Sequence, residues 1–212
     1  MNRGRGHFCP RAELQPGKAD KQACLSHREG ALGKPPARVL ESKVVYSGPV
    51  FGVRRDRVRE PGGVECTRDV VTHAGSVVLL PVFSDGRLLL VRQYRHAVGA
   101  YLWELVAGRI EPGESPLAAA RRELLEETGY TGRRFRRLLD VFPTPGFVSE
   151  CMVVYAVEDL TPGHARPEAD ERIRARRFSL RELEAMMRRG RLRDAKSIAG
   201  ILYYSLLFPK KW

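Results

Sequence analysis

Apolar residues fall into short runs separated by turn residues, a pattern typical of strands. Three such extended segments fill residues 39–73, and the turn Pro61-Gly62-Gly63 separates the last two. A meander this small cannot bury both of its faces alone. We therefore expect it to pack on the rest of the chain or on a second copy.

Longer apolar runs follow and predict a larger sheet. SVVLLPVF (76–83) and RLLLVRQYR (87–95) predict a hairpin around Ser84-Asp85-Gly86. Further strands are predicted for YLWELVAG (101–108), LLDVF (138–142), CMVVYAVEDL (151–160) and RARRF (174–178).

Three helices are predicted from periodicity and end signals. The first, PLAAARRELLEET (116–128), begins after Ser115 as N-cap and ends before Gly129. The second, LRELEAMMRR (180–189), follows a capping box formed by Ser179 and Glu182. The third, AKSIAGILYYSLLF (195–208), follows Asp194 as N-cap. Strands with one central helix and two C-terminal helices predict an α/β sandwich around a mixed sheet.

Composition adds limits to this picture. The chain has 212 residues and 43% hydrophobic content, which suits one core with a small appendage. No apolar run approaches the ~18 residues that a membrane span needs. Residues 1–38 are rich in Gly, Pro, Lys and Arg without a period, so we expect a disordered basic extension.

The first residues lack the apolar region of a secretory signal. The four cysteines are widely spaced, which argues against a zinc knuckle or a disulfide framework. We therefore expect a cytoplasmic protein with no membrane association.

The net charge of +12 would attract phosphates. No aromatic-basic binding motif accompanies the charge, so nucleic acid is the less favoured partner.

Residues 108–130, GRIEPGESPLAAARRELLEETGY, concentrate the candidate chemistry. Helical spacing places Arg122, Glu123, Glu126 and Glu127 on one face. Carboxylates this close repel one another, and a hard cation such as Mg²⁺ would relieve that repulsion. A solvated, salt-bridged surface helix is the alternative. The fixed spacing back to Gly108 and Glu114 favours a metal-bearing site.

This segment resembles the Nudix box, G-x5-E-x7-R-E-U-x-E-E-x-G-U with U aliphatic, and departs from it only at Tyr130. The resemblance implies a Nudix hydrolase. It also implies a Nudix-type α/β/α sandwich around a mixed β-sheet in residues 74–212, with a small N-terminal antiparallel meander in residues 39–73.

RQYR (92–95), WELVAG (103–108) and TPGF (144–147, with Pro145) are similar to the ADP-ribose pyrophosphatase branch. That branch implies Mg²⁺-dependent hydrolysis, for which Mn²⁺ can substitute, of ADP-ribose or a related nucleoside diphosphate sugar to AMP and ribose 5-phosphate. The alternatives are another Nudix substrate, such as GDP-mannose or 5'-capped RNA, and a non-catalytic ligand-sensing regulator.

The resemblance also implies roles for individual residues. Metal ligands would be Glu123, Glu127, the Ala107 carbonyl, Glu126 and Glu171. Gly108, Glu114 and Arg122 would support the box.

The catalytic carboxylates would be Glu171, Glu126 and Glu127, and the general base stays open among Glu168, Asp170 and Glu171. Substrate contacts would come from Arg95 and Glu104. Phe51 and Arg68 would reach the site from a partner's meander, which implies a homodimer. Arg95 could equally be a structural partner of Glu104.

Overall fold

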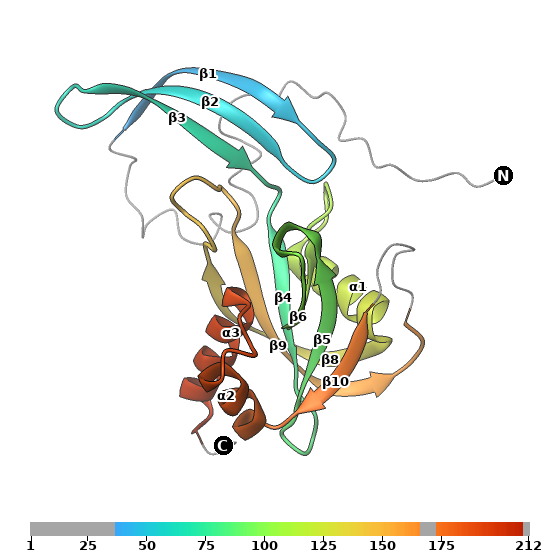
Figure 1. Ribbon diagram of the computed structural model, residues 1–212. Helices are drawn as coiled ribbons and strands as arrows, with labels where there is room; N and C mark the ends of the chain where they lie inside the picture. Colours follow the sequence, from blue (N-terminus) through green and yellow to red (C-terminus); the bar gives the residue numbers. More distant parts are fainter. Residues whose placement is uncertain (1–36, 166–172, 210–212) are drawn as a thin grey trace. The chain divides into compact units, whose positions relative to one another are not determined.

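The computed structural model describes residues 37–165 and 173–209, which divide into two units (Figure 1). The first unit holds the described residues up to Gly75 together with Phe142–Cys151. The second holds Ser76–Val141 and the described residues from Met152 onward.

The first unit is built on an antiparallel meander of β1 (Arg38–Ser47), β2 (Gly52–Arg59) and β3 (Glu65–Thr72). The predicted N-terminal meander is therefore confirmed. Ion pairs link neighbouring strands of the meander, such as Arg55 with Asp69 and Arg59 with Glu65.

The segment Phe142–Cys151, which contains TPGF, lies along β3. The Val71 amide donates to the Phe147 carbonyl at 2.8 Å, and the Ser149 amide donates to the Val71 carbonyl at 2.9 Å. His73 Nδ1 lies 3.5 Å from Glu150 Oε1. This loop therefore belongs to the meander's unit, although about seventy residues separate it from β3 in the sequence.

The second unit contains two sheets. The four-stranded sheet has the order β7 (Val106–Arg109), β4 (Ser76–Pro81), β9 (Met152–Pro162) and β8 (Tyr130–Val141). It is mixed, because β4 runs parallel to β9 and the other pairs are antiparallel. The three-stranded sheet has the order β10 (Arg174–Phe178), β5 (Leu88–Arg95) and β6 (Ala100–Glu104). The predicted α/β fold with a mixed sheet is confirmed.

The predicted hairpin of residues 76–95 is wrong beyond its turn. Val82 and Leu88 form an isolated antiparallel bridge beside the turn, but β4 and β5 then enter different sheets. The reason is that β4 is buried along its whole length and pairs on both edges with β7 and β9. WELVAG divides in the same way, at Leu105, between β6 and β7.

Helices cover both faces of the four-stranded sheet. α1 (Pro116–Thr128) packs on β4, β7 and β8, and α3 (Ala195–Leu207) packs on β4 and β8. Arg121 of α1 stacks on Phe135, whereas the next residue of β8, Arg136, stacks on Phe208 at the end of α3. Successive strand residues point to opposite faces, so α1 and α3 lie on opposite sides of β8, as Figure 1 shows.

The core lies between the sheets and the C-terminal helices, α2 (Leu180–Arg188) and α3. Gly200 allows α3 to approach closely, because a Cβ there would lie 3.1 Å from Leu105 and 3.2 Å from Leu80. A short 3-10 turn, η1 (His96–Val98), connects β5 to β6.

Cys66 is a free thiol, whereas Cys151 is disulfide-bonded. No helix within residues 37–165 and 173–209 is long and apolar enough to cross a membrane.

Candidate active site

Helix α1 carries the candidate carboxylates and has the predicted ends. The Ser115 hydroxyl accepts a hydrogen bond from the Ala118 amide, and Pro116 occupies the first turn. Gly129 ends the helix with φ of 73°, a left-handed conformation that favours glycine. Ala119, Ala120 and Leu124 are buried on one side, which fixes the rotation of the helix and therefore the direction of its charged face.

Arg122 is the centre of the charged face. Its Nε and Nη2 donate to Glu114 at 3.1 and 2.9 Å, and Nη2 also donates to the Arg109 carbonyl at 2.9 Å. Its Nη1 donates to Glu123 at 2.6 Å and to Glu126 at 3.1 Å. One guanidinium thereby ties the loop before α1 to two carboxylates on α1.

These contacts set the charge states of the group. Hydrogen bonding to Glu114, with the charge of Glu123, raises the pKa of Arg122 well above its ordinary value. Partial burial alone would raise the pKa of Glu114, but hydrogen bonds from Arg122 and the Glu111 amide outweigh burial, and the net pKa is lowered. Both groups are therefore charged at neutral pH.

Glu123 lies directly against the backbone of β7. A Cβ built on Gly108 would lie 1.9 Å from the Glu123 carboxyl carbon, so no larger residue fits there without moving that carboxylate. Ala107 precedes Gly108 in the same strand. The structure thus brings Glu123 beside the peptide that was expected to offer a metal-ligating carbonyl.

Glu127 and Glu126 differ in exposure. The Glu127 residue is only 6% exposed, whereas the Glu126 side chain is 40% exposed. A buried carboxylate on a helix otherwise rich in surface charge is costly unless it has a charged or hydrogen-bonding environment. The charge of Glu127 contributes to the raised pKa of Arg95, which places those two groups in one electrostatic environment.

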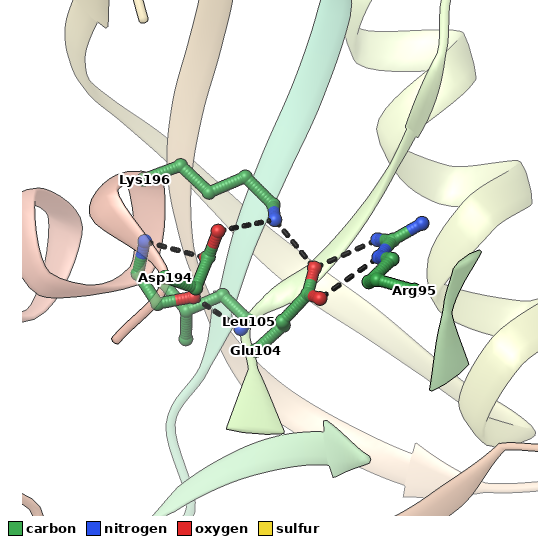
Figure 2. Close-up of polar contacts among 6 residues, drawn as sticks. Arg95, Glu104, Leu105, Asp194 and Lys196 are labelled. Atoms are coloured by element: carbon green, nitrogen blue, oxygen red, sulfur yellow. Dashed lines mark hydrogen bonds and ion pairs between the residues drawn. The ribbon is translucent and has the colours of Figure 1, made fainter. Parts of the chain in front are cut away.

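Arg95 and Glu104 pair with each other. Arg95 Nε and Nη2 donate to the two Glu104 oxygens at 2.8 and 2.7 Å, in a bidentate pair across β5 and β6 (Figure 2). Burial alone would raise the pKa of Glu104, but hydrogen bonds and charge from Arg95 and Lys196 outweigh it and lower the net pKa. Hydrogen bonding to Glu104 raises the pKa of Arg95. The structural pairing that the sequence left open is therefore present.

Phe51 and Arg68 belong to the first unit, and the other predicted site residues that the structure describes belong to the second. Phe51 precedes β2, is 43% exposed and contacts the Tyr46 ring at 5.6 Å. Arg68 donates to Glu60 at 3.0 Å. Gly52, the residue after Phe51, pairs with Thr72, and Arg68 pairs with Asp56, so Gly52 and Arg68 are offset by roughly 13 Å along the strands.

Glu171, with Glu168 and Asp170, lies outside the described residues. Within the part that is described, no three acidic, histidine or cysteine side chains converge to hold a metal ion. The donors at the box are nonetheless carboxylate oxygens, the chemistry that a hard divalent cation prefers. These residues fit magnesium in kind.

Two groups of contacts were not anticipated from the sequence. Lys196 binds Glu104. The only feature of the sequence that could have indicated this contact is the position of Lys196, two residues after the Asp194 N-cap. Tyr130, the one departure from the box, accepts a hydrogen bond from Arg177 of β10 at 2.8 Å. Arg177 also stacks on the Phe83 ring at 3.7 Å. An aliphatic residue at position 130 could not accept that bond.

Comparisons with known proteins agree with this geometry. The NUDIX domain family matches residues 72–200. The chain is 36% identical to an ADP-ribose pyrophosphatase of Mycobacterium tuberculosis (strain ATCC 25618 / H37Rv), over 77% of this chain and 80% of that protein. It is 31% identical to a GDP-mannose pyrophosphatase of Yersinia pestis (strain Pestoides F), over 63% and 72% respectively. A solved structure of an ADP compounds hydrolase shares the fold, with TM-score 0.73 and 21% identity over 84% of this chain and 97% of that one.

This chain belongs to the Nudix hydrolase family, because the NUDIX domain family matches most of it. The capped helix α1 and the hydrogen bonds of Arg122 agree with that assignment. The predicted resemblance to the ADP-ribose pyrophosphatase branch is confirmed by the relative of that name. The chain is therefore an enzyme of the Nudix hydrolase class.

Proposed function

We propose that the protein hydrolyses the diphosphate bond of ADP-ribose or a related nucleoside diphosphate sugar, releasing AMP and ribose 5-phosphate from ADP-ribose. The observation that carries the proposal is the box itself: Glu123 and Glu126 are held by Arg122, and Glu123 is seated against Gly108. The ADP-ribose pyrophosphatase relative supports this substrate class.

Glu123, Glu126, Glu127, Glu171 and the Ala107 carbonyl would hold Mg²⁺, for which Mn²⁺ can substitute. When bound, the cation neutralises phosphate charge and lowers the pKa of a coordinated water. Arg122 keeps two of the carboxylates at fixed positions on α1, so little reorganisation is needed during reaction.

Water supplies the oxygen that attacks one phosphorus, and its proton passes to a carboxylate. That base would be one of Glu168, Asp170 and Glu171, and the catalytic carboxylates would be Glu171, Glu126 and Glu127. The bond between that phosphorus and the bridging oxygen breaks, and the bridging oxygen leaves with the second phosphate.

Arg95 would contact the substrate, and Phe51 and Arg68 would hold the adenine end from the meander of a partner chain. Exposed apolar residues support a homodimer through the meander: Val39, Val44, Val45, Tyr46, Val50, Phe51 and Val64. So many exposed large apolar side chains in one small unit are typical of an interaction surface. A second copy of the same meander would cover them.

A GDP-mannose substrate is the second candidate, because one relative carries that name. Purified protein would be incubated with ADP-ribose, GDP-mannose and 5'-capped RNA, and the released nucleotide identified. We expect AMP from ADP-ribose at the highest kcat/KM. Faster release of GMP or of shortened RNA would reject the ADP-ribose assignment.

The metal role is tested in the same assay. Chelator should abolish turnover and added Mg²⁺ should restore it. Glu127→Gln should lower kcat on the order of 10²-fold or more, because a buried charge is removed with little change in size. Glu184→Gln, which removes an exposed carboxylate from α2, is the matched control and should retain wild-type kcat. Full activity of Glu127→Gln would contradict the proposed site.

A further inference from the structure

Lys196 is a largely buried cation to which the proposed chemistry gives no role. Its side chain, in the first turn of α3, is 12% exposed. Nζ donates to Glu104 at 2.5 Å and to Asp194 at 2.9 Å (Figure 2). An ammonium group is costly to bury unless it is paired, and here two carboxylates pair with it.

The partner of Lys196 is the carboxylate that orients Arg95. Glu104 uses both oxygens for Arg95 and shares Oε2 with Lys196, and its side chain is 2% exposed. The pair occupies Nε and Nη2 of Arg95 and leaves its Nη1 edge outside the pair. The Arg95 side chain is 40% exposed, so a ligand can reach this side chain.

The same network holds the backbone beside the box. The Leu105 amide donates to the Ser197 hydroxyl at 2.7 Å, and Ser197 donates from its amide and its hydroxyl to Asp194. Leu105 lies between β6 and β7, and β7 carries Ala107 and Gly108. The start of α3 is thus attached to the corner that leads into the box.

The charges of these four side chains balance. Lys196 and Arg95 carry two positive charges, and Glu104 and Asp194 carry two negative ones. Without Lys196, the two carboxylates would share one guanidinium, and the excess negative charge would lie in the environment that Arg95 shares with Glu127. Arg95 would then be drawn toward its carboxylates and offer less positive charge to an anion.

We propose that Lys196 is a positioning residue for diphosphate binding: it holds Glu104 so that Arg95 presents its free edge to a phosphate of the substrate. Lys196 acts through Glu104 and Arg95 and does not touch the substrate. This inference rests on the proposed function, because the ligand of Arg95 is taken to be a diphosphate.

The test is a variant cycle measured on the full chain with ADP-ribose. Lys196→Met keeps the length of the side chain and removes its charge. We expect kcat/KM to fall about tenfold, mostly through a higher KM, because a charged hydrogen bond that orients a ground-state contact is lost. Lys196→Arg should recover most of the loss. Arg188→Met, which removes an exposed cation from an ion pair on α2, is the matched control and should change neither constant.

The double variant separates an indirect role from a direct one. If Lys196 acts through Arg95, adding Lys196→Met to Arg95→Gln should cost less than about a further twofold. Losses that multiply would show that Lys196 contacts the substrate or acts elsewhere, and would overturn the proposal. An unchanged KM in folded Lys196→Met, with only a lower melting temperature, would overturn it as well.

Two further arms cover failure of folding or of the proposed substrate. If Lys196→Met does not fold, Asp194→Asn keeps the helix cap and removes one partner of Lys196. It should also raise KM, and an unchanged KM would count against the proposal.

If wild-type protein cleaves nothing in the substrate panel, the proposed function fails by itself. Calorimetry with inorganic pyrophosphate then decides: weaker binding by both Lys196→Met and Arg95→Gln supports the positioning role. Equal binding, or no binding by any of the proteins, rejects it.

Discussion

At the scale of single residues, the box depends on side chains that pack closely against one another and against the backbone. Gly108 has no side chain, which leaves room for the Glu123 carboxylate. The Arg122 guanidinium donates hydrogen bonds in several directions and so binds Glu114, Glu123 and Glu126 together. A lysine could not reproduce those donor directions, although it carries the same charge. Residue identity is therefore constrained here by shape as well as by charge.

Gly108→Ala should displace the Glu123 carboxylate, since its Cβ would lie 1.9 Å from the carboxyl carbon. We expect kcat to fall on the order of 10²-fold, because ångström-scale misplacement of a catalytic group costs about that much. Steady-state kinetics with the substrate that wild type cleaves best would measure the change.

Gly132→Ala is the control, because its Cβ would lie 2.2 Å from the apolar Val157 side chain, away from the box carboxylates. That variant should lose stability while its folded fraction keeps normal kcat. Normal kcat in Gly108→Ala would show that the position of Glu123 is not important for turnover.

At the scale of elements, each long helix begins with a side-chain cap. Ser115, Ser179 and Asp194 accept hydrogen bonds from the amides of Ala118, Glu182 and Ser197. The cap of α2 is reciprocal, since Glu182 accepts from the Ser179 amide at 2.8 Å. The cap of α3 does more, because Asp194 also binds Lys196.

Ser179→Ala should lower the free energy of unfolding by about 1 kcal/mol, the usual cost of losing an N-cap. Asp194→Ala should cost more, because it also removes one of the two carboxylates that pair with Lys196 and the carboxylate that accepts from the Ser197 hydroxyl. Urea unfolding followed by circular dichroism would measure both. Ser179→Thr keeps a hydroxyl cap and should lie near wild type. Equal losses in Ser179→Ala and Asp194→Ala would mean that Asp194 serves only as a cap.

At the scale of the whole molecule, the two units carry different parts of the proposed site. The box, Arg95 and Glu104 belong to the second unit, whereas Phe51 and Arg68 belong to the first. The apolar surface of the meander is the reason to expect a second copy. Under the proposed function, the meander of one chain completes the site of the other.

Mixing an Arg68→Ala chain with a Glu127→Gln chain tests this arrangement. In a mixed dimer with a shared site, one site carries both defects and the other carries neither. That dimer should recover about half of the activity of a wild-type dimer at low substrate. Each variant alone, treated identically, is the control. A monomer at micromolar concentration, or no recovery after confirmed subunit exchange, would refute the shared site.

The sequence alone determined the features that depend on neighbours along the chain. It predicted the three helix starts, the glycine that ends α1 and the meander strands. It also predicted that Arg122, Glu123 and Glu126 lie together. Caps and helical faces are set by residues three or four positions apart, so their physical causes can be read locally.

Only the tertiary structure decided which distant residues meet. It separated β4 from β5, joined Phe142–Cys151 to β3, and placed Lys196 on Glu104 across 92 residues of sequence. Strand partners and buried ion pairs depend on how whole elements pack, because many segments have similar local patterns and compete for the same edges. The role of Tyr130 follows the same rule, since its partner Arg177 lies 47 residues further along the chain.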